Sequence, residues 1–210
     1  MAEVLASAQG LGIIGPGSVE RHVRHAEAFA DAVEQAIRIG SGHPPPSRVV
    51  DLGSGAGLPG LVLARRWPSS SIDLLEGSAR RASFLAEALD RLGWSGRVGI
   101  VAERAEAAGR SPGRRGRYDA VVARSFGLPA VTAECGAPLL EAGGWLVVSE
   151  PPSGGGTEER WPSTGLGELG MSAAIPLVDG GFHFAAVHLL RACPDRFPRR
   201  VGVPVTRPLF

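Results

Sequence analysis

Residues 48–66 combine an apolar run, a glycine-rich segment and a second apolar run, and this unit constrains the fold more than any other part of the chain. Residues 48–52 read Arg-Val-Val-Asp-Leu, a β-branched run that predicts a strand buried on both faces. Residues 53–60 follow as Gly-Ser-Gly-Ala-Gly-Leu-Pro-Gly, and a helix is expected from there to residue 66. Such a unit is typical of an open α/β sheet that binds a ligand beyond the carboxyl ends of its strands.

The same alternation of strands and helices continues along the chain. Further strands are expected at residues 71–76, 98–102, 118–123 and 145–149, and further helices at residues 20–39, 79–92 and 128–140. Residues 173–178 and 182–191 flank Asp179-Gly180-Gly181, which predicts a closing hairpin. We therefore expect an α/β, Rossmann-like fold: a mostly parallel seven-stranded sheet with helices on both faces and a C-terminal antiparallel hairpin.

The chain divides into two expected parts. Residues 1–46 form an N-terminal region with a loose, glycine-rich leader at 1–17 and the helix at 20–39, which Ser18 is placed to cap. Residues 47–210 form the ligand-binding domain. Within it, residues 151–169 are expected to be a polar, glycine-rich connection around a short or absent helix.

Composition excludes several kinds of chemistry. All 22 basic residues are arginine, so the chain can form no pyridoxal Schiff base, no Walker A loop and no kinase-type lysine contact. Any cation in the site is therefore an arginine. The 22 arginines nearly cancel 21 acidic residues, so affinity for a polyanion has to come from local patches.

The cysteines, the histidines and the apolar runs indicate the compartment of the protein and whether it binds a metal or a membrane. Cys135 and Cys193 stand far apart and form no disulfide or metal pattern, which favours a reducing cytoplasm. His22 and His25 lie one helical turn apart, but no further ligand completes a metal set. Because no run of about 20 apolar residues occurs, we expect no membrane span. We also expect no bound metal, since no ligand set is complete, and a monomer.

The glycine loop predicts a nucleoside-containing ligand. Gly53, Gly55 and Gly57 allow a tight turn and leave backbone amides open to a ligand. A Gly-x-Gly-x-x-Gly match ending at Gly60 suits nicotinamide dinucleotides as well as other nucleosides. A nicotinamide-dependent oxidoreductase therefore stays open as an alternative.

Two carboxylates refine this interpretation. Glu76 ends the second strand, 25 residues after Asp51, near the spacing of about 20 at which an acid accepts ribose hydroxyls. Asp51 ends the first strand, where a carboxylate would repel a pyrophosphate and attract an ammonium group. An adenosine ligand with a positive amino-acid tail satisfies both acids. Residues 139–148, Leu-Leu-Glu-Ala-Gly-Gly-Trp-Leu-Val-Val, also match the segment before the fifth strand of S-adenosylmethionine-dependent methyltransferases.

Four segments give the chain a specific resemblance. They are the loop at 51–60 with its Leu-Pro-Gly ending, Leu74-Leu75-Glu76 with Arg80-Arg81, Ala123-Arg124-Ser125-Phe126, and the tail at 196–209; Glu20-Arg21-His22 adds a fifth match. Together they resemble the small-subunit ribosomal RNA guanine-N7 methyltransferases (the RsmG or GidB family). The resemblance implies a class I methyltransferase fold, S-adenosylmethionine as methyl donor, and 16S rRNA or the small ribosomal subunit as partner.

The resemblance and the loop chemistry together predict the site residues. The expected cofactor contacts are Asp51, Gly53, Gly55, Gly57, Leu58, Glu76, Ala105, Glu106 and Arg124. Arg124 either faces the ligand or pairs with an acid such as Asp119. No catalytic acid or base is expected, because guanine N7 carries a lone pair and no proton, so that transfer requires positioning above all.

The basic tail and two departures from the family pattern bear on the substrate. Arg196, Arg199, Arg200 and Arg207 either contact RNA phosphates or pair within the protein. The chain has no asparagine, so it lacks the Asn-Leu pair usual before the domain. It also has Ser149-Glu150 where the family often has Lys-Gly. A retargeted or non-catalytic relative is therefore a further interpretation.

Overall fold

A seven-stranded sheet forms the centre of the protein. The computed structural model describes residues 1–152 and 157–210. The strands are β1 (Arg48–Leu52), β2 (Ser71–Leu75), β3 (Val98–Val101), β4 (Tyr118–Ala123), β5 (Leu140–Glu150), β6 (Ile175–Asp179) and β7 (Phe182–His188), in the order β3-β2-β1-β4-β5-β7-β6. Strands β1 to β5 are parallel, and β7 runs antiparallel to β5 and β6. The expected mostly parallel sheet with a closing hairpin is confirmed.

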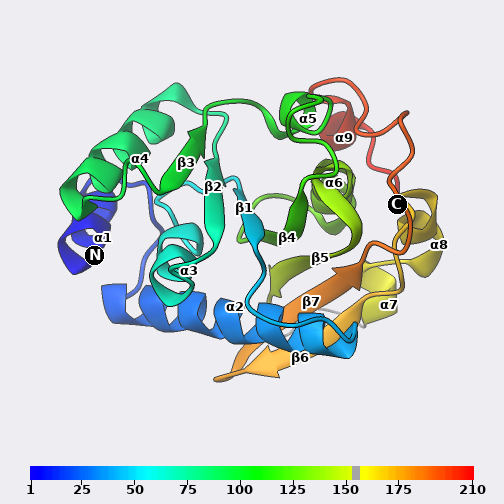
Figure 1. The fold of residues 1–210 in the computed structure, drawn as a ribbon, viewed down its shortest axis with the longest axis horizontal. Coiled ribbons are helices and arrows are strands. Elements are labelled where there is room, and N and C mark those ends of the chain that lie inside the picture. Colours follow the sequence, from blue (N-terminus) through cyan, green and yellow to red (C-terminus); the bar gives the residue numbers. More distant parts are fainter. Residues whose placement is uncertain (153–156) are drawn as a thin grey trace.

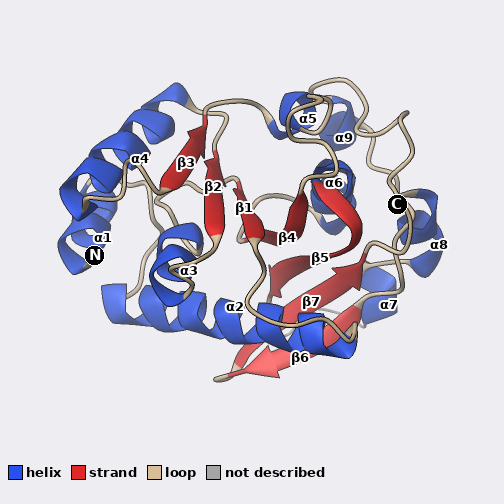
Figure 2. Ribbon diagram, viewed as in Figure 1, coloured by secondary structure: helices blue, strands red, loops and turns tan. Residues whose placement is uncertain are grey.

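Helices cover both faces of this sheet (Figures 1 and 2). The helices are α1 (Ala2–Gly10), α2 (Val19–Ile39), α3 (Gly60–Arg66), α4 (Ala79–Leu92), α5 (Ala105–Ala108), α6 (Pro129–Gly136), α7 (Thr157–Arg160), α8 (Ser163–Glu168) and α9 (Val203–Thr206). Alternate strand residues point to opposite faces. Val49 therefore packs in the core under α2, α3 and α4, whereas Val50 packs in the core under α6 and α8.

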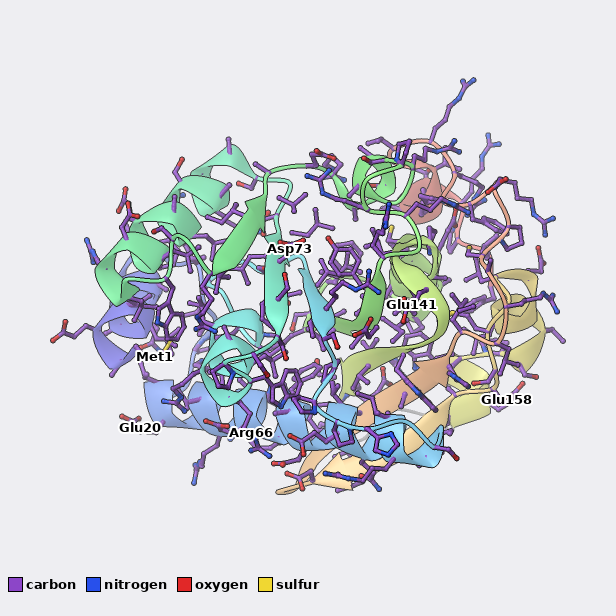
Figure 3. The ribbon with its side chains drawn as sticks, in the orientation of Figure 1. Met1, Glu20, Arg66, Asp73, Glu141 and Glu158 are labelled. Carbon is purple, nitrogen blue, oxygen red and sulfur yellow. The ribbon has the colours of Figure 1, made fainter. Side chains whose placement is uncertain are left out.

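The long helix α2 is attached to the sheet rather than separate from it. Ser18 caps it by accepting a hydrogen bond from the Arg21 amide at 3.2 Å, as expected. Its residues Phe29 and Val33 share one core with sheet residues. Arg66 at the end of α3, labelled in Figure 3, donates to Asp31 and Glu34 of α2. The division of the chain at residue 46 stays a prediction.

Three expectations about local structure were wrong. The leader at 1–17 contains α1, because Val4, Leu5 and Ala8 form an apolar stripe that is buried against the protein. The helix expected at 128–140 ends at Gly136, and a 3-10 turn at Ala137–Leu139 follows. Strand β5 begins at Leu140 and contains Gly143-Gly144, where its register with β4 shifts, so these glycines form a bulge rather than a separate turn.

The hairpin and the connection before it are close to the expectation. Gly180 and Gly181 have φ of 53° and 77°, the positive values that a two-residue hairpin turn requires. Strand β7 ends at His188, three residues before the expected end. The connection at 151–169 contains the short helices α7 and α8. Its residues 153–156 lie outside the described residues. Helices α5 and α9 were not expected, because four residues give too little periodicity to detect.

A buried ion pair anchors the C-terminal tail. Glu134 of α6 is fully buried, and both of its oxygens accept hydrogen bonds from the Arg199 guanidinium, at 2.8 and 2.6 Å. The Arg199 amide donates to the same carboxylate at 2.8 Å. Arg199 therefore pairs within the protein, which was the second of the two expectations for the tail.

We expect Arg199→Ala to lower the free energy of unfolding by about 3 kcal/mol, because it leaves the Glu134 carboxylate buried without its cation. Urea denaturation of the purified protein measures this. The matched control is Arg200→Ala, whose exposed side chain has no described partner, and which should change stability by less than about 0.5 kcal/mol. Equal losses in the two variants would show that the pair does not stabilise the tail.

Candidate functional site

The loop after β1 is held in place by backbone hydrogen bonds and by Asp51. The Gly53 and Ser54 amides donate to Leu75 O at 2.8 and 3.0 Å, which ties the loop to β2. Asp51 Oδ2 accepts from the Gly60 amide at 2.9 Å, which ties the end of β1 to the start of α3. Gly53 has φ of 72°, a conformation that favours glycine. The loop thus crosses the carboxyl ends of the strands in a fixed conformation.

Asp51 lies behind this loop. It is 1% exposed, and burial raises the pKa of its carboxyl to about 7, although the Gly60 amide and Arg124 oppose the shift. Its Oδ1 has no hydrogen-bond partner. The carboxylate therefore keeps one free acceptor beneath the loop and is electrostatically coupled to Arg124.

A cavity of about 490 Å³ opens beside the loop; we call it the Glu76 cavity. Glu76 stands on its wall, with Oε2 accepting from the Gly55 amide at 3.0 Å and Oε1 from the Ser78 amide at 2.8 Å. These bonds fix the carboxylate while leaving lone pairs for a ligand. The remaining lining is Gly53, Leu75, Gly77, Ser78, Arg81, Glu103, Arg104, Ala105, Glu106, Ser125, Phe126, Gly127, Leu128, Val131, Cys135 and Val205. The volume suits a ligand of nucleoside size.

A second cavity, of about 480 Å³, adjoins the first; we call it the Arg124 cavity. Both are lined by Ser125, Phe126 and Gly127, the loop after β4. Ser125 has φ of 53°, which is uncommon for a residue with a side chain. The other walls come from the N-terminal half of α2, the end of β5, α7 and the hairpin turn. Two ligands could therefore meet across the 125–127 loop.

Arg124 is oriented by a histidine of α2. Its Nη2 lies 2.6 Å from His22 Nδ1, and His22 Nε2 lies 3.2 Å from Gly15 O. Because a guanidinium only donates, Nδ1 accepts and Nε2 carries the proton. Burial and the charge of Arg124 lower the pKa of His22, which keeps the imidazole neutral in this tautomer. The other nitrogen, Arg124 Nη1, is buried without a partner and is available to an anionic ligand.

The acid at the end of β5 is neutralised within the protein. Glu150 accepts from the Arg160 guanidinium of α7 and from Trp161 Nε1 at 3.2 Å. The anion that stands where the family often has a cation is therefore paired. His25 lines the same cavity; its Nδ1 is buried without a partner, and its ring packs edge-on against Phe182 at 4.8 Å.

The predicted cofactor residues separate into three groups. Gly53, Glu76, Ala105 and Glu106 border the Glu76 cavity, and Arg124 borders the adjoining one. Asp51, Gly55, Gly57 and Leu58 border neither of the two cavities. Leu58 instead packs with Leu5, Ala26 and Val62, so its side chain serves the core. Asp119 binds Arg48 and not Arg124, which leaves Arg124 to face the cavity.

Some residues of the site were not predicted from the sequence. Phe126 packs against Gly53, and Val131 and Cys135 of α6 form an apolar wall. The sequence pattern also does not indicate that His22 is the partner of Arg124. Its pairing joins positions 102 residues apart, which spacing along the chain cannot reveal.

The tail arginines differ in their availability. Arg196 pairs with Glu168 at 3.5 Å and lies over the Phe197 ring. Arg200 and Arg207 are exposed, and the described residues give their side chains no partner. The part of the chain that the structure describes contains no cluster of three or more potential metal ligands, and none of its helices is long and apolar enough to cross a bilayer.

Comparison with known proteins decides the family. Residues 11–150 match the family described as GidB, rRNA small subunit methyltransferase G. The chain belongs to this family. The relative named ribosomal RNA small subunit methyltransferase G from Prochlorococcus marinus is 33% identical over 174 residues, covering 80% of this chain and 70% of the relative. The protein of that name from Deinococcus deserti is 35% identical over 185 residues, covering 85% and 75%.

Solved structures agree on the fold. Cofactor-bound Rv0187 from MTB has a TM-score of 0.56 at 20% identity and covers 90% of each chain. At this identity the likeness concerns the fold alone. The expected class I methyltransferase fold is therefore confirmed. The family match and the relatives confirm the family resemblance and the expectation of an S-adenosylmethionine-dependent methyltransferase.

We expect Gly53→Ala to weaken binding of S-adenosylhomocysteine, the product form of the cofactor, at least about tenfold. A Cβ at Gly53 would stand 2.6 Å from Phe126 Cδ2, so the cavity wall would have to move. The control is Gly93→Ala, which has a similar φ of 68° but no atom within 4 Å of the added Cβ. It should cost only backbone strain, about 1 kcal/mol of stability, and leave binding by calorimetry unchanged. Equal binding by the two variants would contradict the geometry.

We expect His22→Ala to lower kcat/KM by about ten- to a hundredfold, because a buried guanidinium N–H loses its acceptor. His22→Gln, whose amide oxygen can accept the same bond, should recover most of the loss. Because the pKa of His22 lies below its ordinary value of 6.5, the activity that depends on neutral His22 should fall only at more acid pH. This acid limb should be absent from the pH profile of His22→Gln. If His22→Gln kept the acid limb of the wild type, or recovered none of the kcat/KM lost in His22→Ala, His22 would not position Arg124.

Proposed function

We propose that this chain transfers the methyl group of S-adenosylmethionine to N7 of a guanine in the 16S rRNA of the small ribosomal subunit. The observation that carries the proposal is the pair of cavities that share the 125–127 loop. Family membership supports the RNA acceptor, because the relatives are named for small-subunit rRNA. It also favours a methyl donor over a nicotinamide cofactor.

The donor set fits S-adenosylmethionine. Glu76 would accept hydrogen bonds from the ribose hydroxyls, and Val131 and Cys135 would pack against the adenine. Arg124 Nη1, buried without a partner, would donate to the methionine carboxylate where the tail passes the 125–127 loop. Asp51, in its ionised form behind the glycine loop, would favour the ammonium group through its charge. When bound, the cofactor supplies an electrophilic methyl group on a sulfonium.

The chain's own residues have a positioning task. Guanine N7 attacks with a lone pair and releases no proton, so no side chain needs to act as a base. The 125–127 loop would hold the base in line with the methyl group. The Arg124 cavity would receive the guanine, and Glu150 on its wall, already neutralised by Arg160, adds no uncompensated anion there. Neutral His22 would keep Arg124 turned toward the cofactor.

The remaining assignments follow from the same proposal. The reaction would take place in the cytoplasm, where small subunits are assembled, and the chain would act as a monomer without a resident metal. Cys135 and Cys193 are buried free thiols, which suits a reducing compartment. Arg200 and Arg207 are exposed and could contact RNA phosphates from the tail.

We expect the purified protein to transfer a labelled methyl group from S-adenosylmethionine to 16S rRNA or 30S subunits that lack the modification. Glu76→Ala should abolish the transfer at cofactor concentrations that saturate the wild type, whereas Glu76→Gln, which keeps one acceptor oxygen, should lose less. A scintillation assay on separated rRNA measures both.

Calorimetry separates the alternatives. Binding of S-adenosylhomocysteine with labelling of 16S rRNA would support the proposal, and binding of NADH in preference to S-adenosylhomocysteine would overturn it. Cofactor binding with label only in another RNA would indicate a retargeted relative. Glu150 and the missing Asn-Leu pair are the reasons for considering this interpretation.

A further inference from the structure

Two arginines of α2 stand beside the Arg124 cavity without a described partner. Arg21 and Arg24 lie one helical turn apart and are exposed. Within residues 1–152 and 157–210, neither guanidinium makes an ion pair or a side-chain hydrogen bond. Glu20, which precedes Arg24 by one turn, interacts with it only through space. By contrast, Arg199 and Arg196 of the tail have carboxylate partners in Glu134 and Glu168.

These arginines line a hollow that adjoins the Arg124 cavity; we call this hollow the α2 groove. Its volume is about 480 Å³, and it lies between α2 and the turn joining β6 to β7. Arg21, Gly181 and Phe182 border both hollows, so the two adjoin. Figure 1 shows α2 running alongside β7 and β6, the two strands whose connecting turn lines the groove opposite α2. Gly180 and Gly181 have no side chains to close its far wall.

The acids around the groove are mostly neutralised. Glu27 pairs with Arg65, and Asp31 pairs with Arg66 at 2.9 Å. Asp179 is the lining acid for which the described residues provide no ion-pair partner. Two free guanidinium groups therefore face one free carboxylate, and the groove has a positive balance. Phe182 adds an aromatic wall at the junction with the Arg124 cavity.

We propose that the α2 groove holds the single-stranded RNA segment next to the target guanine, with Arg21 and Arg24 contacting its phosphates. The inference rests on the proposed function. A guanine reaches a cavity of this kind only after it leaves its stack, and this costs least when the segment around it is already single-stranded. Binding of single-stranded RNA combines a positive groove along the backbone with aromatic contacts to bases. The α2 groove offers both features, and it adjoins the Arg124 cavity, which would receive the guanine.

The test measures binding of full-length protein to unmodified 16S rRNA over a series of KCl concentrations. Each lost phosphate contact to single-stranded RNA lowers the slope of log affinity against log salt by about 0.7. Arg21→Gln with Arg24→Gln should therefore reduce the slope by about 1.4 and weaken binding at any fixed salt concentration. Binding of S-adenosylhomocysteine should not change, because neither residue borders the Glu76 cavity.

Two further variants control for charge and location. Arg91→Gln with Arg110→Gln removes the same charge from exposed residues of α4 and the 109–117 segment, away from the groove, and should leave the slope unchanged. Asp179→Ala should strengthen RNA binding, because it removes the unpaired anion.

An unchanged slope in the Arg21 and Arg24 variant, or an equal decrease in the control, would overturn the groove proposal. If the wild type labels 16S rRNA, that result leaves the proposed function standing. If the wild type labels no rRNA, the proposed function itself fails.

Discussion

The hydrogen bond from the Gly60 amide to Asp51 Oδ2 holds the site together. It joins the end of β1 to the start of α3 across the glycine-rich loop. The carboxylate is buried, so losing the bond would leave a polar group without compensation. Because the loop is fixed at both ends, the Gly55 amide can in turn hold Glu76 at the wall of the cavity.

The second half of the site depends on α2, which precedes the glycine loop in the chain. Its His22 contacts Arg124, and its exposed Arg21 and Arg24 line the α2 groove beside the Arg124 cavity. In the proposed function, the loops at the ends of the sheet strands hold the cofactor, and α2 supplies part of the RNA-binding surface. This arrangement explains how a chain with a net charge of +1 could bind RNA, since the charge that matters is local.

Much of the fold could be predicted from the sequence, because buried parallel strands leave continuous apolar runs and the glycine loop marks the carboxyl end of the first strand. The wrong boundaries have specific causes. Pro138 and the bulge at Gly143-Gly144 altered the passage from α6 to β5. Helix α1 depends on burial of Leu5 against Leu58 and Val62, a contact between segments that local periodicity does not encode.

The site residues that directly follow a strand could be predicted from the sequence. Glu76 and Arg124 follow strands, and both face cavities. Contacts between distant segments were less accessible. The sequence could not show that Arg199 of the tail pairs with Glu134 and is therefore not free to bind RNA. It also could not show that Leu58 faces the core. Pairing in three dimensions decides which of many arginines remain available for RNA.

The most direct test of the account is complementation of a strain that lacks its own small-subunit rRNA guanine-N7 methyltransferase. The modification would be read by mass spectrometry of 16S rRNA fragments. The account predicts that this chain restores a single 7-methylguanosine, and that Glu76→Ala does not. Unmodified 16S rRNA from cells that contain the folded, cofactor-binding wild type would contradict the central claim.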